Sequence, residues 1–165
     1  MQATQLIADA GLRARLYPKI EPLLSELPTT LKDSAGAKSK GTIGRYVRIE
    51  LPGDRKTLTL AEVEVFSDGR NVAGQGKASQ INVAHGAEAR RAIDGNKSGT
   101  FGDGGQTHTN EATKNPWWEL DLGEEQPIDS VAIYNRTEGA LGKRLDGFTL
   151  RVLDAARNDV FKSEK

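Results

Sequence analysis

The sequence predicts an all-β domain, a sandwich or a barrel, that follows a short α-helical extension. Three observations predict this fold class: apolar and polar residues alternate over several short runs after residue 43, turns rich in glycine and aspartate separate the runs, and no long helical pattern lies between them. Several short strands without intervening helices are typical of β-sandwiches and barrels. We therefore expect a helical extension and linker over residues 1–43 and a β-sandwich over residues 44–165.

The helical expectation covers residues 3–31. Within "QLIADAGLRARLY" the apolar residues recur at helical spacing, although Gly11 weakens the pattern. A second short apolar stripe follows, with Pro22 in its first turn, where proline is tolerated. Residues 32–43 are small, polar and glycine-containing, which indicates a linker. We interpret this part as a domain-boundary remnant, with a docking arm as the alternative.

The period of the pattern changes to two from residue 44. "RYVRIEL" and "TLTLAEVEVF" predict two strands, and the "PGDRK" between them predicts a hairpin turn. The later predicted strands are "WWELDL", "SVAIYN", "FTLRVL" and "DVFKSE", separated by the turns "GEEQP", "GALGKR" and "DAARN".

Composition excludes several classes of partner and site. The 23 basic and 23 acidic residues balance, so charge gives no reason to expect nucleic acid or an anionic membrane as a partner. We expect no membrane insertion, because there is no long apolar run, and no signal peptide is visible. The absence of cysteine excludes disulfides and thiolate metal sites, and leaves the compartment open.

The residues that could support catalysis are few. His85 and His108 are the only histidines, no third nitrogen or sulfur ligand clusters with them, and no Ser-His-Asp context is present. A glycosidase would need two facing carboxylates, for which Asp94, Glu62 and Asp121 qualify by residue type alone. We therefore expect a protein that is not an enzyme.

One polar loop contains a candidate cation site. Asp94-Gly95-Asn96 tolerates left-handed backbone, exposes carbonyl oxygens and carries a carboxylate, which together suit calcium; an ordinary Asx turn is the alternative. Glu62 lies on a strand face otherwise held by apolar residues, where a carboxylate needs a partner or a metal. If the strand instead ends or bulges there, Glu62 is simply solvated.

A second polar cluster contains a candidate hydroxyl-binding site. His108 lies in a short polar loop, and Arg136, Lys143 and Arg144 follow the later strand "SVAIYN". An imidazole and two cations suit vicinal hydroxyls, and Glu138 could hold Arg136 rigid. The alternative is a salt-bridged surface turn, which most such clusters are.

The adjacent tryptophans do not form a stacking pair for a ligand. Neighbouring strand residues point to opposite faces of a sheet. We expect one of Trp117 and Trp118 in the core and the other near the rim of the loop.

Taken together, these pieces resemble the F-type lectin family, the fucose-binding branch of the galactose-binding-like or discoidin-like jelly rolls. The matching stretches are "GRYVRIELPG", "LTLAEVEVF", "NVAGQGKASQ", "RAIDGN", "THT", "NPWWELDLG", "IDSVAIYNRTEG" and "KRLDGFTLRVLD". The resemblance implies a jelly-roll β-sandwich. In the family the first two stretches close the domain, so residues 44–66 indicate a circular permutation, with this segment pairing into the sheet that "NVAGQGKA" and "FTLRVL" help build. The alternative is that the segment belonged to a preceding domain and swaps or frays.

The resemblance also implies a calcium site that ties the 91–105 loop to the strand at residues 61–62. Its ligands would be carbonyl groups, with the side chains of the two acidic residues. The implied set is Arg91, Asp94, Asn96, Gly105, Ala61 and Glu62.

For the sugar site, the resemblance implies His108, Arg136 and a second cation, which is Lys143 by spacing or Arg144 by context. Glu138 replaces the usual aspartate, and Ala140 or Leu141 would have to supply the apolar wall for fucose or a related sugar. Such a site binds weakly on its own, so useful binding would come from several copies or from tethering.

We therefore expect a non-catalytic, calcium-stabilised carbohydrate-binding module of a larger, secreted bacterial protein, placed outside the cell, in the periplasm or at the cell surface, with a glycan and neighbouring domains as partners. The alternatives are a structural jelly roll that keeps the calcium site but binds no sugar, and a fragment of a carbohydrate-active enzyme.

Overall fold

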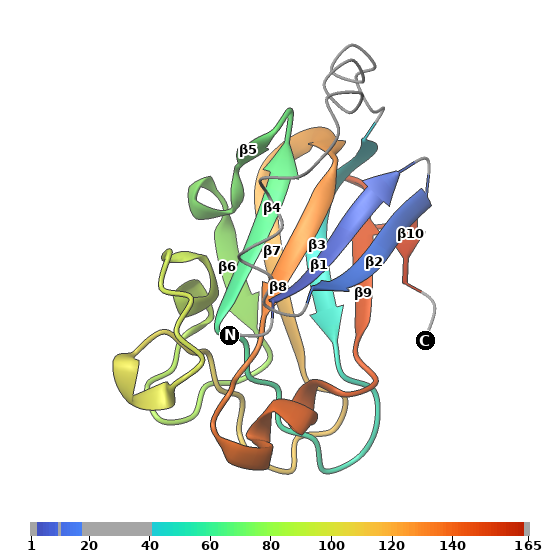
Figure 1. Ribbon diagram of the computed structural model, residues 1–165. Coiled ribbons are helices and arrows are strands. Elements are labelled where there is room, and N and C mark those ends of the chain that lie inside the picture. Colours follow the sequence, from blue (N-terminus) through green and yellow to red (C-terminus); the bar gives the residue numbers. More distant parts are fainter. Residues whose placement is uncertain (1–2, 10, 18–40, 164–165) are drawn as a thin grey trace, which may run out of the picture.

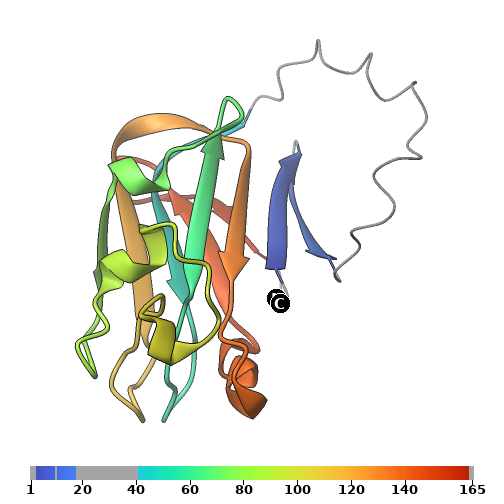
Figure 2. The ribbon, with the colours of Figure 1, turned by 60° about the vertical axis from the view of Figure 1, so that its left-hand side comes forward.

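The computed structural model describes residues 3–9, 11–17 and 41–163, and it consists mostly of two antiparallel β-sheets that face each other (Figures 1 and 2). This arrangement is consistent with a galactose-binding-like β-sandwich. One sheet has the order β2 (Gly11–Tyr17), β1 (Ala3–Asp9), β8 (Ser130–Tyr134), β4 (Glu62–Ser67), β5 (Arg70–Asn71). The other has the order β10 (Asp159–Lys162), β9 (Thr149–Leu153), β3 (Thr42–Glu50), β7 (Trp117–Ile128), β6 (Lys77–Gln80). Short 3-10 helices connect them: η2 (Ala73–Gln75), η3 (Ala89–Ile93), η4 (Phe101–Asp103) and η5 (Gly139–Leu145).

The core lies between the two sheets and follows the predicted alternation. Val47 and Ile49 of β3 are fully buried, as are Val63 and Val65 of β4. The strand pattern that predicted an all-β fold for residues 44–163 is therefore confirmed, because one side chain in two faces the opposite sheet.

The predicted hairpin between the first two strands is wrong. β3 pairs with β7 and β9 in one sheet, whereas β4 pairs with β8 and β5 in the other. The connection crosses between the sheets because residues 53–60 pair with residues 107–115 instead of folding back, with Lys56 and Thr113 forming a bridge.

Residues 44–66 pair into the sandwich, but they divide between its two sheets. Only β3 joins the sheet that contains β6 and β9, as expected, and β4 lies in the other one. Both strands have a partner on each side, which contradicts the alternative that this segment frays.

The predicted helical extension is also wrong where the structure describes it. Residues Ala3–Asp9 and Gly11–Tyr17 form an antiparallel strand pair, and β1 pairs with the side of β8 that β4 leaves free (Figure 2). A sheet edge has a row of free backbone donors and acceptors, and pairing with it overrides a weak helical preference. The expected helix and linker over residues 18–40 lie outside the described residues.

One predicted turn is a distortion within a longer strand. The stretch "GEEQP" lies inside β7, where residues 122–125 lie opposite Arg45 of β3. The shift in register accommodates the extra residues without ending the strand.

The long loops gather at one end of the sandwich. Figure 1 shows η4, η5 and the connections around them at its lower end. There the segment 53–60 runs beside 107–115, with Thr107 N–H and Thr109 N–H donating to Leu60 O and Leu58 O over 2.9 and 3.1 Å. This pairing gives the loop end a rigid frame.

Candidate functional site

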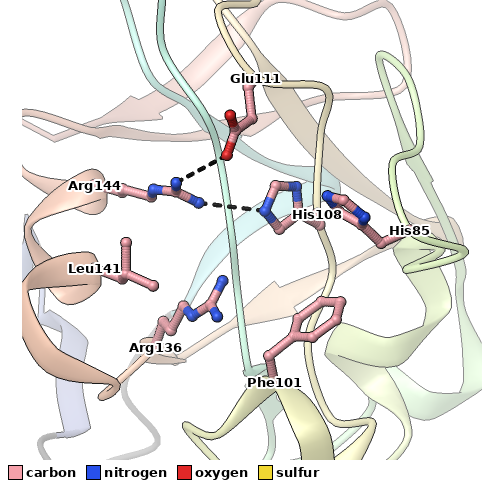
Figure 3. Close-up of a pocket in the computed structure, with 7 residues that line it drawn as sticks. All are labelled: His85, Phe101, His108, Glu111, Arg136, Leu141 and Arg144. Carbon is pink, nitrogen blue, oxygen red and sulfur yellow. Dashed lines mark hydrogen bonds and ion pairs between the residues drawn. The ribbon is translucent and has the colours of Figure 1, made fainter.

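A pocket of about 300 Å³ opens between the loops at this end (Figure 3). Its volume is at the lower end of the range of small-molecule sites. The lining residues come from four segments that are remote in sequence: His85, Phe101, His108, Glu111, Arg136, Leu141 and Arg144.

His108 is held in one tautomer. Its Nδ1 lies 2.6 Å from the carbonyl oxygen of Thr109, and its Nε2 lies 3.2 Å from Nη1 of Arg144. A carbonyl only accepts and a guanidinium only donates, so Nδ1 carries the proton and Nε2 is the acceptor. Burial lowers the pKa of His108, and the positive charges of Arg144 and Arg136 lower it further. The ring is therefore neutral at neutral pH.

Arg136 is fixed by Glu138. The carboxylate oxygen Oε2 of Glu138 accepts hydrogen bonds from Nε of Arg136 at 2.7 Å and from the Phe101 N–H at 2.9 Å, and it forms an ion pair with Nη2 of Arg136 at 2.6 Å. The Phe101 N–H and the guanidinium hold the pKa of Glu138 below its usual value. The guanidinium carbon lies 5.2 Å from the centre of the Phe101 ring. Nη1 of Arg136 has no partner among the described residues, so its two hydrogens can bind a ligand.

Arg144, and not Lys143, lines the pocket with His108. Its Nη2 donates to Glu111 over 3.1 Å, while its Nη1 reaches His108 (Figure 3). Lys143 lines a neighbouring pocket instead. The difference arises because η5 turns consecutive residues of this loop in different directions.

Three rings form a wall that the sequence alone did not indicate. His85, Phe101 and His108 meet edge to face, with ring centres 4.9 to 6.1 Å apart. Leu141 lines the pocket as expected, whereas Ala140 does not. The signal for Phe101 was a large apolar residue in the glycine-rich stretch "GTFGDGG", and for His85 a lone histidine beside Gly86.

The second predicted site centres on a buried carboxylate. Glu62 is 2% exposed, its Oε1 accepts from the Gly95 N–H over 3.1 Å, and its Oε2 has no partner among the described residues. Burial raises the pKa of Glu62 to about 7, and the negative charge of nearby Asp94 contributes. Glu62 is therefore buried, and the groups that influence its pKa are the Gly95 N–H, Asp94, Glu64 and Lys97.

The 94–105 loop folds around this carboxylate. Asp94 Oδ1 accepts from the Asn96 N–H over 2.9 Å, which is the Asx turn foreseen as the alternative. Gly105 lies against Asn96, because an added Cβ would come within 2.7 Å of the Asn96 carbonyl oxygen. The η3 segment with Arg91 packs on β4, which follows Ala61 directly. The structure thus brings Asp94 near Glu62, with Asn96 bonded to Asp94 and Gly105 packed against Asn96.

Several other buried side-chain atoms have no hydrogen-bond partner among the described residues. Besides Glu62 Oε2, they include both amide atoms of Gln106 and the Thr59 hydroxyl, on the two segments that run side by side here. Buried polar atoms normally have partners, and orphaned ones mark a bound ion or water. Among the described residues no three His, Cys, Asp or Glu side chains cluster as metal ligands. Glu62 and Asp94 offer oxygen atoms, the ligand type that calcium takes and that structural zinc sites use less often.

The tryptophans lie on opposite faces, as predicted. Trp118 is fully buried and donates from Nε1 to the Ala89 carbonyl over 2.9 Å, which anchors η3 to the core. Trp117 lies on the outer face, with the Arg48 guanidinium 4.3 Å from its ring centre.

Comparison with known proteins finds similarity over part of the chain. The family described as "NedA-like, galactose-binding domain" matches residues 91–164. Fucolectin-6 of Anguilla japonica is 40% identical over 98 residues, which cover 54% of this chain and 52% of the relative. Fucolectin-1 of the same organism is 37% identical over 108 residues, 62% of this chain and 60% of the relative. Fucolectin of Anguilla anguilla is 39% identical over 87 residues, 50% of this chain and 54% of the relative.

The chain thus spans between about half and three fifths of the length of these curated relatives. No solved structure gives a significant match. In the part of the chain that the structure describes, no helix is of the length and apolarity that a membrane crossing requires. The matched part of the chain is thus similar to a galactose-binding domain family and to the fucolectins.

Proposed function

We propose that the domain binds a fucose-class sugar in the pocket lined by His108, Arg136 and Arg144. One observation carries the proposal: His108 presents a fixed acceptor nitrogen opposite the open Nη1 group of Arg136, in a pocket with an apolar wall. An acceptor and a planar donor pair match the vicinal hydroxyls of a monosaccharide. The fucolectin relatives bear a name that denotes such a ligand.

Each group has a separate role in this proposal. A sugar hydroxyl takes the place of Arg144 Nη1 at Nε2 of His108, donates to that nitrogen and accepts from the guanidinium that it displaces. Arg136 donates to a neighbouring hydroxyl. Glu138 positions Arg136 and Glu111 positions Arg144. Phe101, His85 and Leu141 contact the apolar side of the ring, including a methyl group if the sugar has one. Lys143 lies outside this first pocket and takes no part in binding the sugar there.

The second proposal is that calcium binds between the 91–105 loop and residues 61–62. The orphaned Oε2 of Glu62 and the nearby Asp94 carboxylate supply negative charge, and carbonyl groups of Arg91, Asn96, Gly105 and Ala61 complete the set. When bound, the ion neutralises a buried carboxylate and links the loop to β4. The role of the ion is structural, because it would fix the 91–105 loop, and this loop leads directly to His108.

Fucolectins are non-catalytic lectins, and we accordingly propose a binding module rather than an enzyme. Its proposed partners are a glycan and neighbouring domains of a larger polypeptide. We place the protein outside the cytoplasm, in keeping with the fucolectins it resembles. One shallow pocket binds a single sugar weakly, so useful binding comes from several copies or from tethering.

We also propose that the strand order is a circular permutation of the usual one. β3 lies in the interior of one sheet and β4 in the interior of the other, although both strands precede residues 91–164, which the family match covers. A chain that begins at Gly69 and ends at Ser67, with residue 163 linked to residue 41, should melt near the temperature of the original chain. If it does not fold, the permuted order is essential and the proposal fails.

The test of sugar binding is calorimetric titration with methyl α-L-fucoside in calcium. We expect a dissociation constant on the order of 1 mM, as for one weakly bound small ligand. His108→Ala should abolish binding while circular dichroism shows an unchanged fold. If the His108 ring proves necessary for folding, Arg144→Gln is the second variant and should likewise abolish binding. Arg70→Gln, on an exposed arginine of β5, is the matched control.

Three outcomes separate the alternatives. Binding that His108→Ala and Arg144→Gln leave unchanged would refute the assignment of the pocket. A calcium-stabilised domain that binds no sugar would be the structural module considered from the sequence. Turnover of a chromogenic fucoside would make it an enzyme fragment.

A further inference from the structure

A second pocket adjoins the candidate sugar pocket and shares part of its wall. Its volume is about 380 Å³, and Glu111 and Arg144 line both pockets. The remaining lining residues are Arg55, Lys56, Thr57, Ala112 and Lys143.

This second pocket concentrates positive charge that the protein does not neutralise. The carboxylate of Glu111 is already paired with Arg144 at 3.1 Å, whereas Arg55, Lys56 and Lys143 have no ion pair among the described residues. On the outer face of the sandwich, by contrast, several arginines are paired with carboxylates, as in the bidentate contact of Arg45 with Asp121. Gathered, unneutralised cations produce a local positive potential that attracts an anion.

The cationic wall is built by tertiary pairing. The Lys56 N–H and carbonyl both bond to the backbone of Thr113, at 2.9 Å each. Arg55 has a φ of 53°, a left-handed backbone that is uncommon for arginine, and it lies in the turn that leads into this pairing. Residues 55–57 therefore present their side chains from a fixed segment, with η5 contributing the other wall.

We propose that this second pocket binds an acidic group, a sulfate ester or a carboxylate, on a sugar next to the one bound in the first pocket. The proposal deepens the proposed function and rests on it, since it makes the ligand an acidic fucosylated oligosaccharide. Arg144 lies between the two pockets and reaches both sugars. Lysine acts on such a group as a point charge, and arginine can donate two parallel hydrogen bonds to it.

The test compares oligosaccharides that share one fucose and differ only in an acidic group. The probes are the Lewis x trisaccharide, its forms sulfated on galactose or on N-acetylglucosamine, and its sialylated form. At low salt we expect at least one acidic form to bind roughly two- to fivefold tighter than the neutral parent, the size of exposed charge pairs. The gain should shrink at physiological salt because exposed charges are screened. The sulfated and sialylated arms show which acid the pocket accepts.

The variants locate the effect. The double change Arg55→Asn and Lys56→Gln removes two charges, and asparagine tolerates the left-handed backbone at position 55. It should abolish the gain while methyl α-L-fucoside binds as before, and Arg70→Gln should keep the gain. If the neutral parent binds and no acidic form binds tighter, or if the double variant keeps the gain, this proposal is overturned and the proposed function stands. If neither the trisaccharides nor methyl α-L-fucoside bind, both are overturned.

Discussion

Two carboxylates at the same end of the sandwich have opposite surroundings. Glu138 is partly exposed, accepts hydrogen bonds from the Phe101 N–H and Arg136 Nε, and forms an ion pair with Arg136 Nη2, and its pKa is lowered. Glu62 is 2% exposed and accepts one backbone hydrogen bond, and its pKa is raised to about 7. The protein supplies a cation and hydrogen-bond donors to the carboxylate of Glu138, but it leaves Oε2 of Glu62 without a partner among the described residues. The cluster around Glu138 is therefore ready to bind a ligand and should change little on binding. The buried carboxylate of Glu62 needs an external positive charge to be stable.

The largest expected effect is therefore the response of stability to calcium. At a hundredfold excess over its dissociation constant, calcium should stabilise the fold by about 2.7 kcal/mol. In a domain of this size that raises the melting temperature by roughly 5–15 °C. Thermal melts in calcium and in chelator measure it.

Glu62→Gln should abolish this response and leave the protein in chelator at least as stable as the original, because the neutral amide replaces a buried charge that lacks a partner. Glu88→Gln, on an exposed carboxylate before η3, should keep the full response. Identical melting of the unaltered protein in calcium and in chelator would refute the calcium proposal.

The next effect in size is that of pH on sugar binding. Protonation of His108 removes the acceptor at Nε2 and adds a positive charge beside Arg144 and Arg136. Because the pKa of His108 is lowered, binding should be constant at neutral pH and fall once the pH drops below about 6.5, by more than tenfold when the ring is fully protonated.

Stability should change in the same direction. The unfolded chain binds the His108 proton at a higher pH than the folded one does, so the contribution is present above about 6.5 and is lost as the pH falls through the lower folded pKa. Calorimetry and circular dichroism at each pH separate lost binding from unfolding. Binding that increases on acidification would show that His108 is not an acceptor.

A smaller effect on sugar affinity is expected when Glu138 is altered. Glu138→Gln removes the charge that holds Arg136, so the guanidinium samples more orientations and the affinity for methyl α-L-fucoside should fall on the order of fivefold. The melting temperature should hardly change, because the pair is partly exposed. Glu124→Gln, on an exposed residue of β7, serves as the control. An unchanged affinity would mean that Phe101 alone positions Arg136.

The sequence predicted the sandwich because burial imposes a period of two. It also singled out Glu62, which is buried, although the groups recorded near it are polar. The crossing of residues 51–61 between sheets was not predictable, since their partner at residues 107–115 is remote in the chain. The same reason explains the N-terminal strands, whose pairing with β8 is invisible in local spacing.

The site was predictable in its charged groups and not in its shape. His108, Arg136 and Arg144 are of residue types that imply hydroxyl binding. The choice of Arg144 over Lys143, and the entry of Phe101 and His85 into the wall, depend on loop conformations. These loop conformations are fixed by contacts between segments that are remote in the chain, and the local sequence pattern does not show which segments meet.

The smallest expected effect would show whether the two carboxylate regions act separately. Residues 99–101 join them, because the Thr137 N–H donates to the Gly99 carbonyl and the Phe101 N–H donates to Glu138, both over 2.9 Å. Removing calcium should loosen this segment and weaken sugar binding about two- to threefold, and sugar should tighten calcium by the same factor, because coupling between two sites is reciprocal.

Gly99→Ala should reduce this coupling, because an added Cβ would come within 2.3 Å of the Thr137 hydroxyl and push the segments apart. Gly102→Ala, where an added Cβ meets nothing within 4 Å, is the matched control. Titrations of fucoside in calcium and in chelator, for all three proteins, measure the coupling. Equal affinities in calcium and in chelator for the unaltered protein would mean that the 91–105 loop stabilises the fold without influencing the sugar pocket.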